Sequence, residues 1–163
     1  MSRYLALAAS VGVLAVVATW IFFLEPVAAY NLQVWQAFIA WGCHYQAGGR
    51  ITGTRNTIVC MSFGAAVGMA AGMLGLHLGG QIGQFAGPVA VGLGATVICL
   101  ASKLPFLAVI PASVYGFASI AGLFLLREGM TPTDALVPTI LSIVIGAVFG
   151  YVSEAVAGAL AKK

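Results

Sequence analysis

Polar side chains that could bind a solute gather in the second apolar stretch of the chain. Gln36, His44, Tyr45 and Gln46 lie there, and Trp41 lies among them. Polar residues inside a membrane-spanning helix are costly in lipid and are commonly functional, and these side chains offer both hydrogen-bond donors and acceptors. We predict that they line a water-filled path toward the cytoplasmic end of this segment. The alternative is that they anchor the helix in the headgroup zone.

The fifth apolar stretch contains a proline that is followed by hydroxyl side chains. Pro111 has no backbone N–H, so inside a helix it would leave the carbonyl of Leu107, one turn earlier, without its partner. Ser113, Tyr115 and Ser119 follow in the sequence. A free carbonyl beside these hydroxyls could accept hydrogen bonds from the amide or hydroxyl of a solute. The alternative is a packed kink whose polar groups bond to neighbouring helices.

Glu154 is an acidic residue well inside the last apolar stretch. A buried carboxyl that takes up a proton could couple transport to H⁺, whereas a carboxylate that reaches the interface would have no such role. The motifs His-Glu-x-x-His, Gly-x-Ser-x-Gly and Gly-Lys-Ser/Thr are absent from the sequence, and its seven Lys and Arg are scattered. We therefore predict no enzymatic activity, no cofactor or metal, and no nucleic-acid partner.

The elements that must position these residues are predicted to be membrane helices. Of the 163 residues, 61% are hydrophobic and 7% are charged, against about 45–50% and about 25% in soluble proteins. No polar stretch is long enough for a soluble domain, so residues 1–163 are expected to form a single transmembrane domain. The fold class is then all-α and polytopic. Six spans are predicted, at about 4–24, 32–48, 56–78, 85–102, 104–126 and 135–160.

The positive charges assign the ends of these spans to the two sides of the membrane. With six spans and a cytoplasmic N-terminus, the C-terminus is cytoplasmic too, and Arg127 is the basic residue that remains outside. Cytoplasmic loops of membrane proteins are enriched in Lys and Arg. The predicted cytoplasmic set is Arg3, Arg50, Arg55, Lys103, Lys162 and Lys163.

An internal repeat organises the six spans. TIVCMSFGAAVG, from Thr57, recurs as TILSIVIGAVFG, from Thr139, and 139 − 57 gives an offset of 82 positions. The repeats, about 1–81 and 82–163, each hold three spans, and this odd number predicts a 3+3 inverted-topology repeat. The second and fifth helices are non-ideal membrane helices, and they match each other less well than the repeated motif does. Their segments 37–41 and 108–112 are offset by 71 positions instead of 82. Glycines one turn apart predict close helix packing; they are Gly64, Gly68, Gly72, Gly146 and Gly150.

Three stretches of the sequence carry a family resemblance. They are WQAFIAWGCHYQAGG, KLPFLAVIPASVYGFASIAG and the Gly-Ala-x-x-Gly-Tyr that ends at Tyr151. The chain resembles a bacterial inner-membrane family of unknown function typified by YcdZ, in the order of its spans and in the proline-containing fifth segment. The resemblance implies a small multi-pass protein of the bacterial cytoplasmic membrane and implies no substrate or mechanism.

Sparse charge and neutral hydrogen-bonding groups on two non-ideal helices favour a function in transport. We predict a channel or facilitator for a small uncharged polar solute of the urea, short-amide or small-alcohol class. A single subunit of six helices has few helices to enclose a pore and also shield it from lipid. We therefore expect a homo-oligomer embedded in membrane lipid. One alternative is a proton-coupled transporter that uses Glu154, and another is a membrane interaction or scaffold protein with a dry, packed interior.

Overall fold

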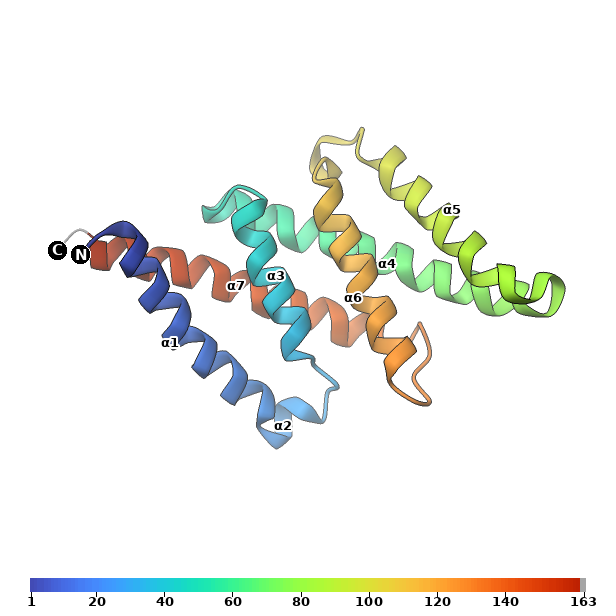
Figure 1. The fold of residues 1–163 in the computed structure, drawn as a ribbon, viewed down its shortest axis with the longest axis horizontal. Coiled ribbons are helices and arrows are strands. Elements are labelled where there is room, and N and C mark those ends of the chain that lie inside the picture. Colours follow the sequence, from blue (N-terminus) through green and yellow to red (C-terminus); the bar gives the residue numbers. More distant parts are fainter. Residues whose placement is uncertain (162–163) are drawn as a thin grey trace.

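The computed structural model describes residues 1–161, and within this range the chain is helical with no strand. The predicted all-helical fold class is confirmed. The helices are α1 (Arg3–Phe23), α2 (Glu25–Ala28), α3 (Val34–Gln46), α4 (Arg50–Ile82), α5 (Ala86–Ala101), α6 (Ile110–Leu126) and α7 (Leu136–Ala161), with 3₁₀ turns η1 (Gly83–Phe85) and η2 (Pro105–Leu107) (Figure 1). Lys162 and Lys163, which entered the predicted charge distribution, lie outside the described residues.

Local sequence sets the helix ends. The Ser2 side chain accepts a hydrogen bond from the backbone N–H of Leu5 at 3.3 Å and so caps α1, as serine commonly does. Helix α1 stops before Glu25, and Pro26 occupies the first turn of α2, where its missing N–H costs nothing. Gly83 ends α4 with a φ of 57°, a conformation that glycine adopts without steric cost.

Six longer helices lie where six spans were predicted, but they differ in length. Within residues 1–161, three helical segments are long and apolar enough to cross a membrane: Arg3–Phe23, Arg50–Ala101 and Leu136–Ala161. The second of these contains both α4 and α5. Helices α3, α5 and α6 have 13, 16 and 17 residues, fewer than the roughly 20 needed to span a bilayer. The fold is therefore compatible with a membrane protein, and six complete crossings stay a prediction.

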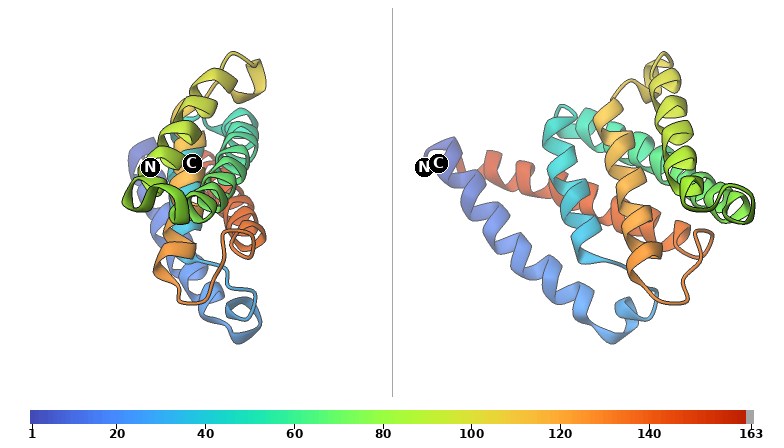
Figure 2. Two further views of the ribbon diagram at one scale, coloured as in Figure 1. Left: turned by 90° about the vertical axis from the view of Figure 1, so that its right-hand side faces the viewer. Right: turned by 45° about the vertical axis from the view of Figure 1, so that its right-hand side comes forward.

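The two long helices α4 and α7 form the centre of the molecule. Helix α4 packs against α5 and α6, helix α7 packs against α1 and α3, and α4 and α7 contact each other. Figures 1 and 2 show α1 and α5 at opposite ends of this arrangement, with the short helices α3 and α6 between them. The last turns of α7 lie beside the start of α1.

Glycines lie where these helices cross most closely. A side-chain carbon at Gly64 would overlap the backbone of Ser113 on α6, and one at Gly146 would overlap the backbone of Ala37 on α3. Close backbone approach of this kind is how membrane helices gain packing energy. The other predicted packing glycines, Gly68, Gly72 and Gly150, lie against Ile120, Phe124 and His44 respectively.

The predicted helix interruption at Pro111 is wrong. Helix α6 begins at Ile110, so Pro111 lies in its first turn, where a backbone N–H has no intrahelical partner to lose. Leu107 lies before the helix, in η2. The segment 104–126 is therefore a 3₁₀ turn followed by an ordinary helix, and Pro111 frees no carbonyl of Leu107 inside a helix.

Candidate functional site: two buried polar clusters

Helix α3 carries polar side chains into the interior of the protein. It lies against α7 and α4. Gln36 and His44 have 0% of their surface exposed, and Trp41 has 4%. Burying a polar group without a hydrogen-bond partner is costly, so the hydrogen bonds of these residues show which neighbours form a site.

The first cluster surrounds Gln36 and connects three helices. Its side-chain Nε2 donates to the backbone oxygen of Ser119 on α6 at 2.9 Å and to Oγ1 of Thr139 on α7 at 3.1 Å. One turn away, the hydroxyl of Ser142 accepts a hydrogen bond from the backbone N–H of Gln33 at 3.0 Å. Polar groups of α3, α6 and α7 therefore meet at one place, which we call the Gln36 cluster.

Two atoms of the Gln36 cluster have no hydrogen-bond partner among the described residues. They are Oε1 of Gln36 and Oγ of Ser119, and both residues are fully buried. Nearly all buried polar groups in proteins are paired, so an unpaired one requires an explanation such as a bound water or ligand. The meeting point of α3 and α6 therefore holds one acceptor and one hydroxyl that no described residue pairs.

The second cluster joins the end of α3 to α7 and to the start of α4. Nε2 of His44 lies 3.1 Å from Oε2 of Glu154, and Nδ1 of His44 lies 3.2 Å from the hydroxyl of Thr54. Oε2 of Glu154 also accepts a hydrogen bond from the backbone N–H of Arg50 at 2.5 Å. The His44 side chain is fully buried, whereas 34% of the Glu154 side chain is exposed.

The hydrogen bonds of Thr54 indicate where the protons lie. When its one hydroxyl proton goes to the backbone oxygen of Arg50, 2.9 Å away, Thr54 accepts a hydrogen bond from Nδ1 of His44, 3.2 Å away. With Nδ1 protonated, Nε2 either donates a proton to Glu154 or accepts one from it. This assignment follows from the hydrogen-bond network. In this arrangement His44 and Glu154 share one proton between Nε2 and Oε2.

Two helix ends meet at this pair. His44 lies in the last turn of α3, where the helix dipole favours a positive charge, and Glu154 contacts the first residue of α4, where it favours a negative one. The turn between the helices has positive φ at Gly48 (116°), Gly49 (64°) and Arg50 (51°). This conformation directs the N–H of Arg50 at the carboxylate.

Ser153 on α7 contacts two further polar residues of α3, Trp41 and Tyr45. Oγ of Ser153 accepts from Nε1 of Trp41 at 2.9 Å and lies 2.5 Å from the hydroxyl of Tyr45. The hydroxyl of Ser10 on α1 donates to the backbone oxygen of Ser153 at 2.9 Å. The Trp41 ring also stacks on Phe149, with 5.5 Å between the ring centroids. These contacts fix α3 and α1 against α7.

The predicted site residues divide between the interior and the surface. Gln36, Trp41, His44, Ser113 and Ser119 are buried, Leu107 is buried within η2, and Tyr45 is half-buried; Gln46, Pro111 and Tyr115 are exposed. The predicted ladder of Ser113, Tyr115 and Ser119 is therefore wrong for Tyr115, which faces away from the interior. Gln46 and Pro111 likewise line no interior path.

Several residues that make these hydrogen bonds were not predicted from the sequence. They are Ser10, Thr54, Thr139, Ser142 and Ser153. Those on α7 follow a signal that the sequence does contain, because Thr139, Ser142, Gly146, Gly150 and Ser153 recur at spacings of three and four and so share one helix face.

The protein has two grooves, and the first of them borders the His44–Glu154 cluster. One, of about 980 Å³, opens beside Glu154, among the start of α1, the start of α4 and the last turns of α7. The other, of about 590 Å³, lies among α4, α5 and α6, and no charged residue lines it among those described. Within residues 1–161, no three His, Cys, Asp or Glu side chains come together as metal ligands would.

The protein has apolar helices of membrane length around buried polar clusters. It is therefore an all-helical protein compatible with a membrane location. The chain belongs to the family described as "Protein of unknown function (DUF1097)", whose model matches residues 8–158. No curated protein and no solved structure matches the chain. The match agrees with the resemblance to a family of unknown function, and the likeness to YcdZ stays a prediction.

Proposed function

We propose that this protein is a pathway through the bacterial cytoplasmic membrane for a small uncharged polar solute, of the urea, short-amide or small-alcohol class. In this proposal its helices form a 3+3 inverted-topology repeat, it assembles as a homo-oligomer, and both termini are cytoplasmic. The observation that carries the proposal is the Gln36 cluster, where two unpaired, neutral polar atoms are buried at the meeting point of α3 and α6.

Equivalent contacts between the two halves support an inverted repeat, because the long central helix of each half packs on a short helix of the other half. Gly64 of α4 packs on Ser113 of α6, while Gly146 of α7 packs on Ala37 of α3. The glycines are 82 positions apart, and the two residues that they meet are 76 apart, instead of the predicted 71 for these helices. Figure 1 shows each helix of one half running opposite to its counterpart, α4 against α7, α3 against α6 and α1 against α5. A twofold axis along the line of view would relate them.

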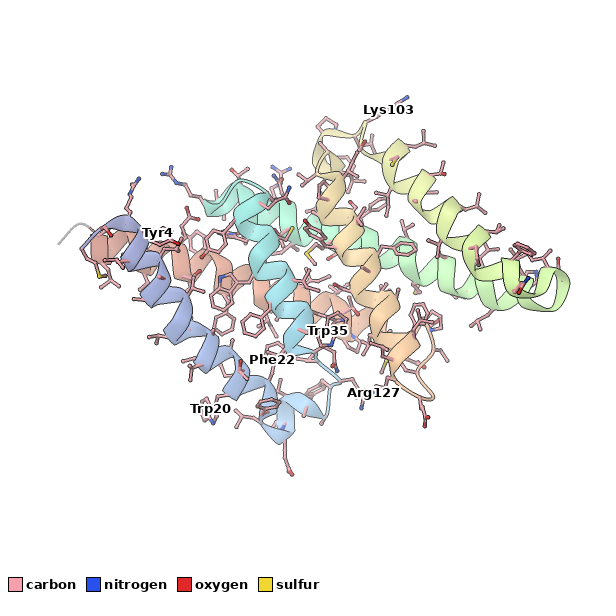
Figure 3. All side chains as sticks on the ribbon, viewed as in Figure 1. Tyr4, Trp20, Phe22, Trp35, Lys103 and Arg127 are labelled. Atoms are coloured by element: carbon pink, nitrogen blue, oxygen red, sulfur yellow. The ribbon has the colours of Figure 1, made fainter. Side chains whose placement is uncertain are left out.

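The placement of charge supports the proposed orientation. Lys103 lies at one edge of the molecule and Arg127 at the opposite edge, and Tyr4 and Trp20 lie toward the two ends of α1 (Figure 3). Basic residues on one side of a membrane and interfacial aromatics at both sides are typical of membrane proteins. In the proposed orientation Lys103 faces the cytoplasm and Arg127 faces outward.

The proposal predicts that the Gln36 cluster is reached by water. In a protein without its native cysteines, Ser119→Cys is expected to react with a small water-soluble methanethiosulfonate, and millimolar urea or acetamide is expected to slow the reaction. The matched control is a protein that keeps Cys60 alone, which is fully buried among apolar residues. Equal slow labelling of both proteins, with rapid labelling after denaturation, would instead support a dry, packed scaffold.

The shared proton of His44 and Glu154 favours proton-coupled transport as a second candidate. The pair lies between a buried α3–α7 contact and an open groove, so a proton can reach it from one side of the molecule. If the pair loses its shared proton, Nε2 and Oε2 face each other as two acceptors and the contact weakens. Proton exchange would then change how α3 packs against α7.

Glu154→Gln tests this second candidate, because glutamine has nearly the size and shape of glutamate and cannot exchange the proton. In proteoliposomes, an inward proton gradient is expected to drive uptake of the solute by the wild type and not by Glu154→Gln, while downhill flux persists in both. The matched control is Asp134→Asn. Asp134 accepts hydrogen bonds from the hydroxyl and the backbone N–H of Thr131, which hold the pKa of its carboxyl below the usual range. A wild type indifferent to the gradient would exclude coupling.

A further inference from the structure

The groove beside Glu154 combines cationic and apolar walls. Arg3 from the first turn of α1 and Arg50 from the first turn of α4 both line it. The rest of its lining is mostly small or apolar and includes Leu7, Ile51, Ala155, Ala157, Gly158 and Ala159. A cationic rim above an apolar wall matches the two parts of a phospholipid.

The two guanidinium groups are available to a ligand. Among the described residues, the ion pair formed is His44 with Glu154, and neither arginine side chain donates a hydrogen bond. Glu154 is the acid that borders the groove, and its Oε2 atom already lies 3.1 Å from Nε2 of His44 and accepts a hydrogen bond from the backbone of Arg50. Its negative charge is therefore offset within the protein. Guanidinium groups bind phosphate in a bidentate manner with good geometry.

The second groove provides a comparison within the same molecule. It is lined by glycines and apolar residues of α4, α5 and α6, together with Thr131, and it presents no cation. A groove that bound only acyl chains would need no charged residue in its lining. The arginines at the first groove therefore indicate a ligand with a negative headgroup rather than lipid chains in general.

We propose that the groove among α1, α4 and α7 binds one anionic phospholipid, with the phosphate between Arg3 and Arg50 and an acyl chain along Leu7 and Ile51. Basic pockets between helices on the cytoplasmic side of a membrane are suited to anionic headgroups. The inference depends on a membrane location with these arginines at the cytoplasmic surface. It does not depend on the transport of any solute.

Native mass spectrometry of the purified protein tests this site. We compare retention of phosphatidylglycerol with that of phosphatidylethanolamine of the same acyl chains. Each arginine near an anionic headgroup is expected to contribute about fivefold in binding, so the preference of the wild type for phosphatidylglycerol should be roughly 25-fold. Arg3→Gln and Arg50→Asn should each remove about fivefold, and together they should nearly abolish it. Asparagine is chosen because it tolerates the φ of 51° at position 50.

Lys103→Gln is the matched control, since Lys103 lies in the turn after α5 and does not line the groove. It should keep the wild-type preference. Equal retention of the two lipids by the wild type, or an unchanged preference in the double variant, would overturn the proposal. Displacement of phosphatidylglycerol by millimolar inorganic phosphate would also overturn it, because the site would then serve a free anion. Arg3→Gln leaves the turn around Glu154 intact, so the test does not depend on the folding of the Arg50 variant.

Discussion

Replacing Gly64 by alanine is expected to lower the melting temperature of the purified protein, whereas the same replacement at Gly92 is expected to raise it. A side-chain carbon at Gly64 would overlap the backbone of Ser113. A side-chain carbon at Gly92 would have no described atom within 4 Å, apart from its chain neighbours and the backbone of its own helix. Overpacking costs roughly 1–3 kcal/mol. An exposed glycine in a helix gains about 0.5–1 kcal/mol when it becomes alanine.

Gly146→Ala should behave as Gly64→Ala does, because its new side-chain carbon would overlap the backbone of Ala37. Thermal unfolding in a mild detergent, followed by tryptophan fluorescence, measures both effects. The prediction fails if Gly64→Ala and Gly92→Ala shift the melting temperature in the same direction. It also fails if Gly146→Ala is neutral, because the α3–α7 contact would then be looser than the structure shows.

Gln36→Leu is expected to reduce solute flux to the rate of protein-free liposomes without destabilising the protein. Leucine has a similar size and removes the unpaired Oε1 atom, and the hydroxyl of Thr139 can instead bond within its own helix. The two lost hydrogen bonds and the removed unpaired acceptor nearly cancel, so the free energy of unfolding should change by no more than about 1 kcal/mol. A loss of flux without a loss of stability would show that the polar atoms of Gln36 serve the solute rather than the fold.

Gln46→Leu is the matched control for this experiment. Gln46 lies on the same helix but is exposed, so its replacement should change neither flux nor melting temperature. Wild-type flux in Gln36→Leu would exclude the Gln36 cluster from the path. Loss of the melting transition in Gln36→Leu would show that this glutamine has a structural role.

The sequence predicts the helices well because apolar length and helix-ending residues are local signals. Ser2, Pro26 and Gly83 are residues of this kind, at the start of α1, the start of α2 and the end of α4. The prediction for Pro111 is wrong because the apolar run from 104 to 126 gives no sign that it contains a 3₁₀ turn before the helix. Tyr115 could have been placed correctly, since it lies two residues from Ser113 and therefore about 200° around the helix.

The pairing of side chains across helices could not be predicted in the same way. His44 and Glu154 are separated by 110 positions, and nothing local to either residue indicates the other. Their contact depends on the glycine at position 150, which brings α7 against α3 at His44, and on the turn that directs Arg50 at the carboxylate. Such pairings follow from the packing of whole helices and become visible only in the structure.

Stopped-flow light scattering of proteoliposomes tests whether the protein lets small neutral solutes cross a membrane. Vesicles that contain the wild-type protein and empty vesicles of the same lipid are mixed with gradients of urea, acetamide and glycerol, and the rate of volume recovery is measured. If the protein is such a pathway, vesicles with the wild type should recover their volume faster than empty vesicles for at least one of these solutes. Recovery rates equal to those of empty vesicles for every solute would contradict it.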